Sequence, residues 1–157
     1  MTDPSSNAAF VLIHGAWHSR ETWNELTPEL EALGHAVVAI DLPGAGANAS
    51  VPESFHRRPL DPAAFGSEPS PNAGVTQEQR TEATIDAVRE AAKAGNGEVV
   101  LVGHSLGGLT ISPVAEAIPD ELRAVVYLTA FLLPNGMVAG EMIGHEIMAD
   151  AEVPPLF

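Results

Sequence analysis

A glycine-rich hexapeptide between a strand-like run and a helix-like run constrains the fold of this chain more than any other feature. The run Glu98–Val102 is mostly valine and leucine, and the sequence GHSLGG follows at positions 103–108, before a segment of helical length. A serine flanked by glycines at such a junction is typical of a nucleophile elbow, a sharp turn that lifts the hydroxyl above the end of a sheet. The motif makes Ser105 the candidate nucleophile, with Gly103 and Gly107 allowing strand and helix to approach closely.

The rest of the chain alternates between strand-like and helix-like segments. Short continuous apolar runs predict parallel strands buried on both faces, at Ala9–His14, Ala36–Ile40, Glu98–Val102 and Ala124–Leu133. Three helices are predicted between these runs. The first is at Trp23–Leu33, with Leu26, Leu30 and Leu33 on one face, the second is at Thr76–Ala94, and the third follows the glycine-rich hexapeptide to about Ile118. The second begins with a capping-box pattern, because Gln79 follows Thr76 by three residues. This alternation predicts an α/β fold with a mostly parallel sheet and helices on both of its faces.

The segment 42–74 lacks any periodicity that would predict a helix or a strand. It holds six prolines, at positions 43, 52, 59, 62, 69 and 71. Connections longer than about 15 residues are usually functional lids or disordered segments. Both interpretations of this long Pro-rich loop stay open: a lid or pocket wall, or a disordered connection.

Charge and composition exclude several classes of partner. The 157 residues carry 21 acidic and 7 basic side chains, a formal net charge of −14, and the largest basic cluster is the pair Arg57 and Arg58. Nucleic acid and anionic membranes are therefore not expected partners. The absence of cysteine excludes disulfides, thiolate nucleophiles and cysteine-ligated metals. The N-terminus has no basic region and no apolar run approaches about 18 residues, so we expect a cytoplasmic protein.

A second loop has the pattern of an oxyanion hole. Acyl transfer needs two backbone N–H groups aimed at the oxygen that becomes negatively charged in the transition state. One donor is expected from Leu106, the residue after the candidate nucleophile. The other is expected from the loop after an earlier strand, where His14-Gly15-Ala16-Trp17 makes Ala16 the candidate donor.

Four segments together resemble the α/β-hydrolase superfamily, and most closely its branch of hydroxynitrile lyases and small methylesterases. They are FVLIHGAW at 10–17, IDLPGAG at 40–46, LVGHSLGG at 101–108 and VYLTAFLLPNG at 126–136. The resemblance implies that Ser105 is the nucleophile, that Ala16 and Leu106 donate to the oxyanion, and that no metal or cofactor takes part. It also implies that residues 1–133 are the N-terminal part of the hydrolase core and that 134–157 begin a cap. Hydroxynitrile lyases carry a threonine at the position of Gly15. Because this chain lacks that threonine, the resemblance favours ester hydrolysis over cyanohydrin cleavage.

The histidine and the acid of a catalytic triad are not evident in the sequence. A serine needs a histidine to take its proton and a carboxylate to orient that histidine, and in this superfamily both follow the serine along the chain. Only 52 residues follow Ser105, and their one histidine, His145, lies in the predicted cap. The earlier histidines are better explained by structural or solvated roles, and no spacing singles out one acid among Asp120, Glu121, Glu141, Glu146 and Asp150. We therefore expect the acid and the histidine to come from a missing C-terminal half.

Two classes of function fit these features. The first is a serine hydrolase that cleaves small carboxylic esters through an acyl-enzyme, with a lactonase or a hydroxynitrile lyase as alternatives on the same fold. The second is a non-catalytic module that binds small apolar ligands between sheet and cap. In either case the apolar strand Ala124–Leu133 is expected to form a sheet edge in this chain, which predicts aggregation, a homodimer or a separate C-terminal fragment as partner.

Overall fold

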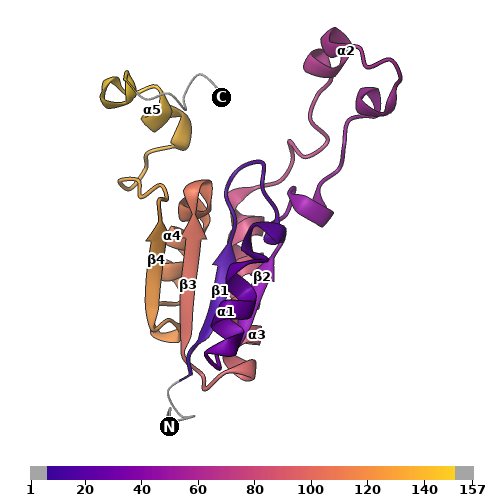
Figure 1. Cartoon of the computed structure of the whole chain (residues 1–157). Coiled ribbons are helices and arrows are strands. Elements are labelled where there is room, and N and C mark those ends of the chain that lie inside the picture. Colours follow the sequence, from indigo (N-terminus) through magenta and orange to yellow (C-terminus); the bar gives the residue numbers. More distant parts are fainter. Residues whose placement is uncertain (1–6, 151–157) are drawn as a thin grey trace.

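A parallel four-stranded sheet organises the protein. The structure, a computed structural model, describes residues 7–150. Its strands are β1 (Ala9–Ile13), β2 (Val37–Ile40), β3 (Val99–His104) and β4 (Ala124–Leu128), in the order β2-β1-β3-β4 (Figure 1). Every neighbouring pair is parallel. The expected α/β class with a parallel sheet is confirmed.

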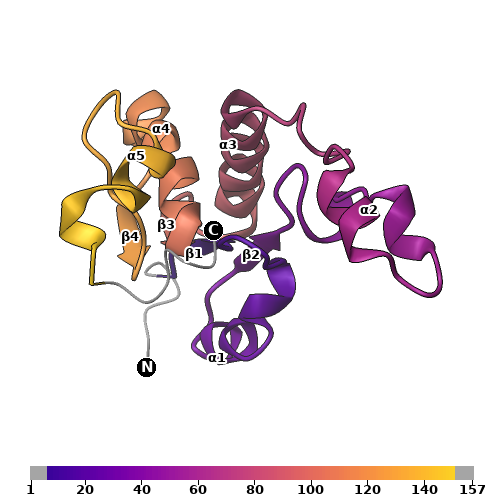
Figure 2. The ribbon, with the colours of Figure 1, turned by 90° about the horizontal axis from the view of Figure 1, so that it is seen from above.

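Helices cover both faces of this sheet. Figure 2 shows α3 (Gln77–Ala94) and α4 (Gly108–Ala117) on one face and α1 (Leu26–Ala32) on the other. The larger core lies under α3 and α4, where Val11 and Ile13 of β1 meet Val88 and Ile111. A smaller cluster on the opposite face joins Leu12 and Val102 to the buried Trp23. The capping box predicted at the start of α3 is present: Thr76 Oγ1 accepts from the Gln79 N–H, and the Gln79 side chain accepts from the Thr76 N–H.

The strand register brings three loops to one edge of the sheet. Ile13 pairs with Ile40 of β2 and with Gly103 of β3, and Gly103 pairs in turn with Tyr127 of β4. Because the carboxyl ends of parallel strands lie side by side, the loops after β1, β2 and β3 meet above the same edge, where open α/β sheets bind ligands. The candidate site is built from these three loops.

The helix expected at Trp23–Leu33 is shorter in the structure and is preceded by a separate turn. A 3₁₀ turn, η2, spans Arg20–Trp23, and α1 begins only at Leu26. Of the predicted apolar face, only Leu30 packs against the smaller core, whereas Leu33 is 66% exposed. Trp23 is 4% exposed and fills the space beside Leu12. This one large ring therefore supplies the burial that the sequence pattern assigned to three leucines.

Two of the predicted strands also differ from the structure. The segment 36–40 was expected to be buried on both faces, but β2 is an edge strand and all four of its residues are only half-buried. The strand expected at Ala124–Leu133 ends at Leu128, because Thr129 has a φ of 42° and turns the chain away from the sheet. Its expected position at an edge is confirmed.

The segments after β2 and β4 extend beyond the carboxyl edge of the sheet (Figure 1). The long Pro-rich loop, in which no periodicity predicted a helix or a strand, contains η3 (Gly46–Asn48), η4 (Glu53–His56) and α2 (Pro62–Ser67). Asn72 joins the two ends of this loop, because its side-chain amide donates a hydrogen bond to the Ser50 carbonyl and accepts one from the Ser50 N–H. The predicted cap region contains α5 (Ala139–Ile143) and η7 (Glu146–Met148), and its residues 151–157 lie outside the described part. The remaining 3₁₀ turns are η5 (Ser105–Gly107) and η6 (Pro119–Glu121).

Candidate active site

Ser105 occupies a tight turn between β3 and α4. β3 ends at His104, and Ser105 starts the 3₁₀ turn η5 that leads into α4. Its φ is 53°, in the left-handed region that residues with a side chain rarely adopt. The Phe131 N–H donates to the Ser105 carbonyl at 3.0 Å, so the chain after β4 holds the turn from behind. A strained backbone of this kind is typical of positions that serve a function.

The glycines of the elbow lie where a side chain would not fit. A Cβ at Gly103 would come within 2.7 Å of Ile111 Cδ1, and one at Gly107 within 2.9 Å of the carbonyl oxygens of Ile13 and His14. Gly108 is tighter still, because its Cβ would lie 2.0 Å from the Phe131 carbonyl oxygen. These three glycines let α4 begin directly against β1, β3 and the segment after β4.

The loop after β1 packs directly on Ser105, the candidate nucleophile. A Cβ at Gly15 would lie 2.7 Å from Ser105 Cβ and 3.2 Å from Ser105 Oγ. Ala16 and Leu106 both line a cavity of about 160 Å³ beside this contact. Leu106 lies in the first turn of η5, where a backbone N–H has no partner within the helix. The structure thus brings the two candidate oxyanion donors to one cavity next to the candidate nucleophile.

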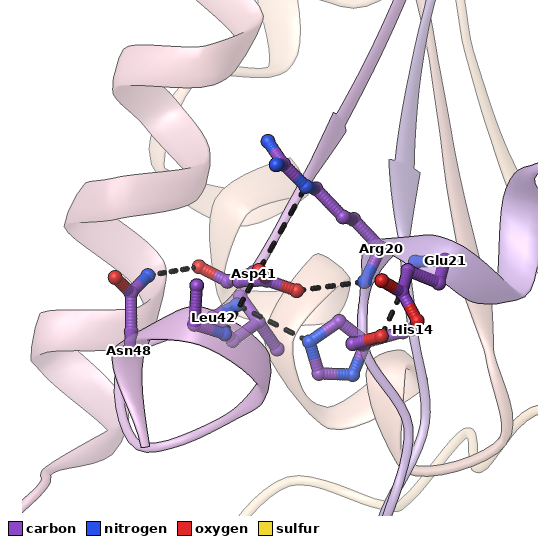
Figure 3. Close-up of polar contacts among 8 residues, drawn as sticks. His14, Arg20, Glu21, Asp41, Leu42 and Asn48 are labelled. Atoms are coloured by element: carbon purple, nitrogen blue, oxygen red, sulfur yellow. Dashed lines mark hydrogen bonds and ion pairs between the residues drawn. The ribbon is translucent and has the colours of Figure 1, made fainter. Parts of the chain in front are cut away.

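His14 fixes the loop after β1, residues 14–17, which we call the candidate oxyanion loop, and both of its ring nitrogens are occupied by backbone groups. It is 2% exposed, and its Nε2 accepts a hydrogen bond from the Leu42 N–H at 3.2 Å (Figure 3). Nε2 therefore carries no proton, and Nδ1–H donates to the Gly15 carbonyl at 2.8 Å. With both ring nitrogens bound to backbone, this histidine joins the ends of β1 and β2.

Asp41 holds the same two loops together through its carboxylate. Oδ1 accepts from the Arg20 N–H at 2.7 Å and Oδ2 from the Ala47 N–H at 3.0 Å, and Asn48 donates to the Asp41 carbonyl (Figure 3). The hydrogen bond from Arg20 is the main cause that lowers the pKa of Asp41 below its usual range. The sequence pattern did not single out Asp41 as a site residue, although this aspartate lies between a strand-like run and a glycine-rich turn.

His104 precedes the candidate nucleophile in the chain, and its ring lies in an aromatic cluster with His18 and Trp23. Its ring stacks on His18 at 5.7 Å between centroids and meets the edge of Trp23 at 6.3 Å. Burial, and then the nearby His18, lower the pKa of His104. This agrees with the expectation that neighbouring side chains at a sharp turn point apart.

None of the described histidines forms a hydrogen bond with Ser105 Oγ. His35 binds the Ala8 carbonyl at the opposite end of the sheet, His56 lies in η4, and His145 caps η7. Among the candidate acids, Glu121 forms an ion pair with Arg89 at 3.0 Å. Glu121 lies in η6, which precedes β4 and so lies at the opposite end of that strand from the elbow.

Residues 7–150 contain no cluster of three or more side chains able to hold a metal ion. Within that range, none of the helices is long and apolar enough to cross a membrane.

A larger cavity lies elsewhere on the molecule. It measures about 380 Å³ and is enclosed by the outer side of α4 and residues 133–139. Ser105 lines neither this cavity nor the smaller one, but both candidate oxyanion donors line the smaller cavity and neither of them lines this one. We place the site at the smaller cavity, because polar groups able to act on a substrate converge there.

Comparisons with known proteins agree with the α/β fold of this chain. Residues 10–157 match the model of the alpha/beta hydrolase family. The chain is 33% identical to an alpha-hydroxynitrile lyase over 124 residues and 33% identical to methylesterase 2 over 132 residues, both from Arabidopsis thaliana. These alignments cover 78% and 84% of the chain but only 40% and 43% of the relatives.

Solved structures give the same result. A pyrethroid hydrolase from Sphingobium faniae is 30% identical with a TM-score of 0.60, over 84% of this chain and 43% of that protein. Polyneuridine aldehyde esterase is 26% identical with a TM-score of 0.59, over 92% of this chain and 45% of that protein. The chain therefore spans less than half the length of each of these four relatives.

Proposed function

Because this chain belongs to the alpha/beta hydrolase family, we propose that it carries the nucleophile and the oxyanion hole of a serine esterase for small carboxylic esters. The relatives that support an esterase include methylesterase 2 and polyneuridine aldehyde esterase. One observation carries the proposal most directly. Ser105 has a left-handed backbone at the end of β3, and the loop that contains Ala16 touches it with no space for a side chain at Gly15.

The chemistry follows from this arrangement. Ser105 Oγ attacks the ester carbonyl carbon and its proton passes to a base, while the carbonyl oxygen becomes an anion that accepts hydrogen bonds from the Ala16 and Leu106 N–H groups. When the tetrahedral intermediate collapses, the alcohol leaves with a proton and the acyl group stays on Ser105. Water then attacks the acyl-enzyme and releases the acid. Each donor of such an oxyanion hole is worth about 3–4 kcal/mol in the transition state.

The base and its orienting acid belong to the proposal as well. His14 has both ring nitrogens bound to backbone, and His104 faces the aromatic cluster. We therefore assign the base to a histidine in a C-terminal segment that this chain does not contain. The length of the relatives leaves room for such a segment.

The position of Gly15 favours ester hydrolysis over cyanohydrin cleavage. A threonine hydroxyl at this position would help to hold a cyanohydrin oxygen, and a Cβ there would already lie 2.7 Å from Ser105 Cβ. Assayed side by side on an aryl acetate and on mandelonitrile, the complete protein is expected to hydrolyse the ester much faster than it releases cyanide. Faster release of cyanide would reject the esterase assignment.

A covalent probe tests the nucleophile. A fluorophosphonate is expected to label the complete wild-type protein and to leave Ser105→Ala unlabelled. Ser112→Ala is the matched control, since Ser112 lies on α4 and bonds to the Gly108 carbonyl and to Tyr127. Equal labelling of Ser105→Ala and Ser112→Ala would remove Ser105 from the mechanism.

A further inference from the structure

We propose that the cavity between the candidate oxyanion loop and the first turns of α3 and α4 binds a carboxylate anion, with Arg80 as its charged group. The cavity of about 160 Å³ is lined by seven residues: His14, Gly15, Ala16, Leu42, Arg80, Leu106 and Thr110. Its volume is several times the roughly 30 Å³ that one water molecule occupies in the liquid, which is enough for a carboxylate on a short chain. No acidic residue is among the seven.

Three basic side chains, Arg57, Arg58 and Arg80, form no ion pair within residues 7–150, and of these three only Arg80 is half-buried. Four of the seven basic residues, Arg20, Arg89, Lys93 and Arg123, form ion pairs with carboxylates. Within residues 7–150, Arg80 forms no ion pair, and its one hydrogen bond is a long one from Nε to the Pro43 carbonyl at 3.4 Å. In a chain with a net charge of −14, a half-buried guanidinium without a carboxylate partner is suited to an anionic ligand.

The place of Arg80 in its helix supports a role outside the stability of that helix. It is the fourth residue of α3, and a positive charge near a helix N-terminus opposes the helix dipole. The same dipole, together with that of α4, adds a positive field at the cavity, because Arg80 and Thr110 both lie in first turns. Charge and field therefore favour the same class of ligand.

The neutral groups of the cavity complete the binding site. Thr110 Oγ1 accepts from the Gln77 side chain at 3.5 Å, which leaves the hydroxyl proton free to donate into the cavity. The Ala16 and Leu106 N–H groups can donate to one carboxylate oxygen, and Arg80 with Thr110 to the other. The proposal rests on the proposed function in one respect: the acid released by ester hydrolysis is the carboxylate that this site would hold.

The test measures binding rather than turnover. Sodium acetate is titrated into the complete ¹⁵N-labelled protein against sodium chloride at equal ionic strength, while the amide signals of Ala16 and Leu106 are followed. Acetamide serves as the neutral ligand of the same shape. Wild type is compared with Arg80→Gln, Arg80→Lys and the control Arg89→Gln, an exposed arginine of the same helix that pairs with Glu121.

Saturable acetate binding is expected in wild type and Arg89→Gln. Arg80→Gln is expected to weaken it at least tenfold, with Arg80→Lys in between, and acetamide to bind wild type at least tenfold more weakly than acetate. Absence of saturable binding in wild type, equal affinity in Arg80→Gln, or equal affinity for acetamide would each overturn the proposal. If Arg80→Gln does not fold, the acetamide comparison and Arg80→Lys decide. Acetate binding without any fluorophosphonate labelling would reject the esterase and keep the anion site.

Discussion

Replacing Asp41 by asparagine tests whether one carboxylate holds the loops of the candidate site together. The side chain is 9% exposed and accepts two backbone hydrogen bonds, from Arg20 and Ala47. Hydrogen bonds to a charged group contribute about 1.5–3 kcal/mol each. In Asp41→Asn the amide oxygen can still accept one of these two hydrogen bonds, although it no longer carries a charge. The NH₂ group that replaces the other oxygen is a donor facing the second backbone N–H, so that hydrogen bond is lost. The contact with Arg20 Nε at 3.9 Å adds little, because the Arg20 side chain is 64% exposed.

We therefore expect Asp41→Asn to lower the free energy of unfolding by about 2 kcal/mol at pH 7. The pKa of Asp41 is lowered below the unfolded value of 3.8, so its stabilisation is fully present above that value and is lost as the pH falls through the folded pKa. The difference between wild type and variant should accordingly shrink as the pH falls below 3.8.

Urea unfolding, followed by the fluorescence of the buried Trp23, measures this difference across pH. Asp86→Asn is the matched control, because Asp86 is exposed on α3 and its carboxylate accepts no hydrogen bond within residues 7–150. It should change the stability by less than about 0.5 kcal/mol. Equal effects of the two substitutions at pH 7, or a gap that widens in acid, would refute the role given to Asp41.

Three further substitutions probe the elbow and the exposed edge. Ser105→Gly should raise the free energy of unfolding by about 1 kcal/mol, because glycine adopts the φ of 53° without strain. A thermal melt measures this change, and an unchanged or lower stability would argue against strain at the elbow. Gly108→Ala should lower the free energy of unfolding by about 1–3 kcal/mol, since its Cβ would lie 2.0 Å from the Phe131 carbonyl oxygen. Gly140→Ala is the control, because a Cβ there would have nothing within 4 Å, and an equal loss of stability in both variants would contradict the packing at Gly108. Val126 is 41% exposed on the edge strand β4, so Val126→Lys should reduce the self-association of this 157-residue chain in light scattering, and an unaltered association would exclude β4 as the contact.

The sequence predicted those parts of the fold whose signals are local. The apolar runs placed all four strands, and the pair Thr76 and Gln79 placed the start of α3 to the residue, because a capping box is complete within four positions. The end of β4 could not be read in this way. Thr129 leaves the sheet because the following segment binds the elbow through Phe131, a contact between residues 26 positions apart.

In the candidate site, too, the sequence pointed to residues with local signals and not to residues whose contacts are made by the fold. Ser105, Ala16 and Leu106 could be proposed from the sequence because each lies at a fixed offset from a recognisable motif. The sequence analysis did not single out Asp41 or Arg80, because the roles proposed for them depend on contacts that only the fold creates. These are two backbone N–H groups at Asp41 and a cavity shared by three loops at Arg80. A basic residue in the first turn of a helix was the only sequence signal for Arg80.

The acyl-enzyme is the most direct test of the central claim that Ser105 is the nucleophile. The complete protein is mixed rapidly with 4-nitrophenyl acetate, quenched in acid, and examined by intact-mass measurement and peptide mapping. The account predicts a burst of nitrophenol that matches the protein concentration, and one acetyl group on the peptide that contains Ser105. Turnover of the ester with no acetyl group on that peptide, or turnover that persists in Ser105→Ala, would contradict it.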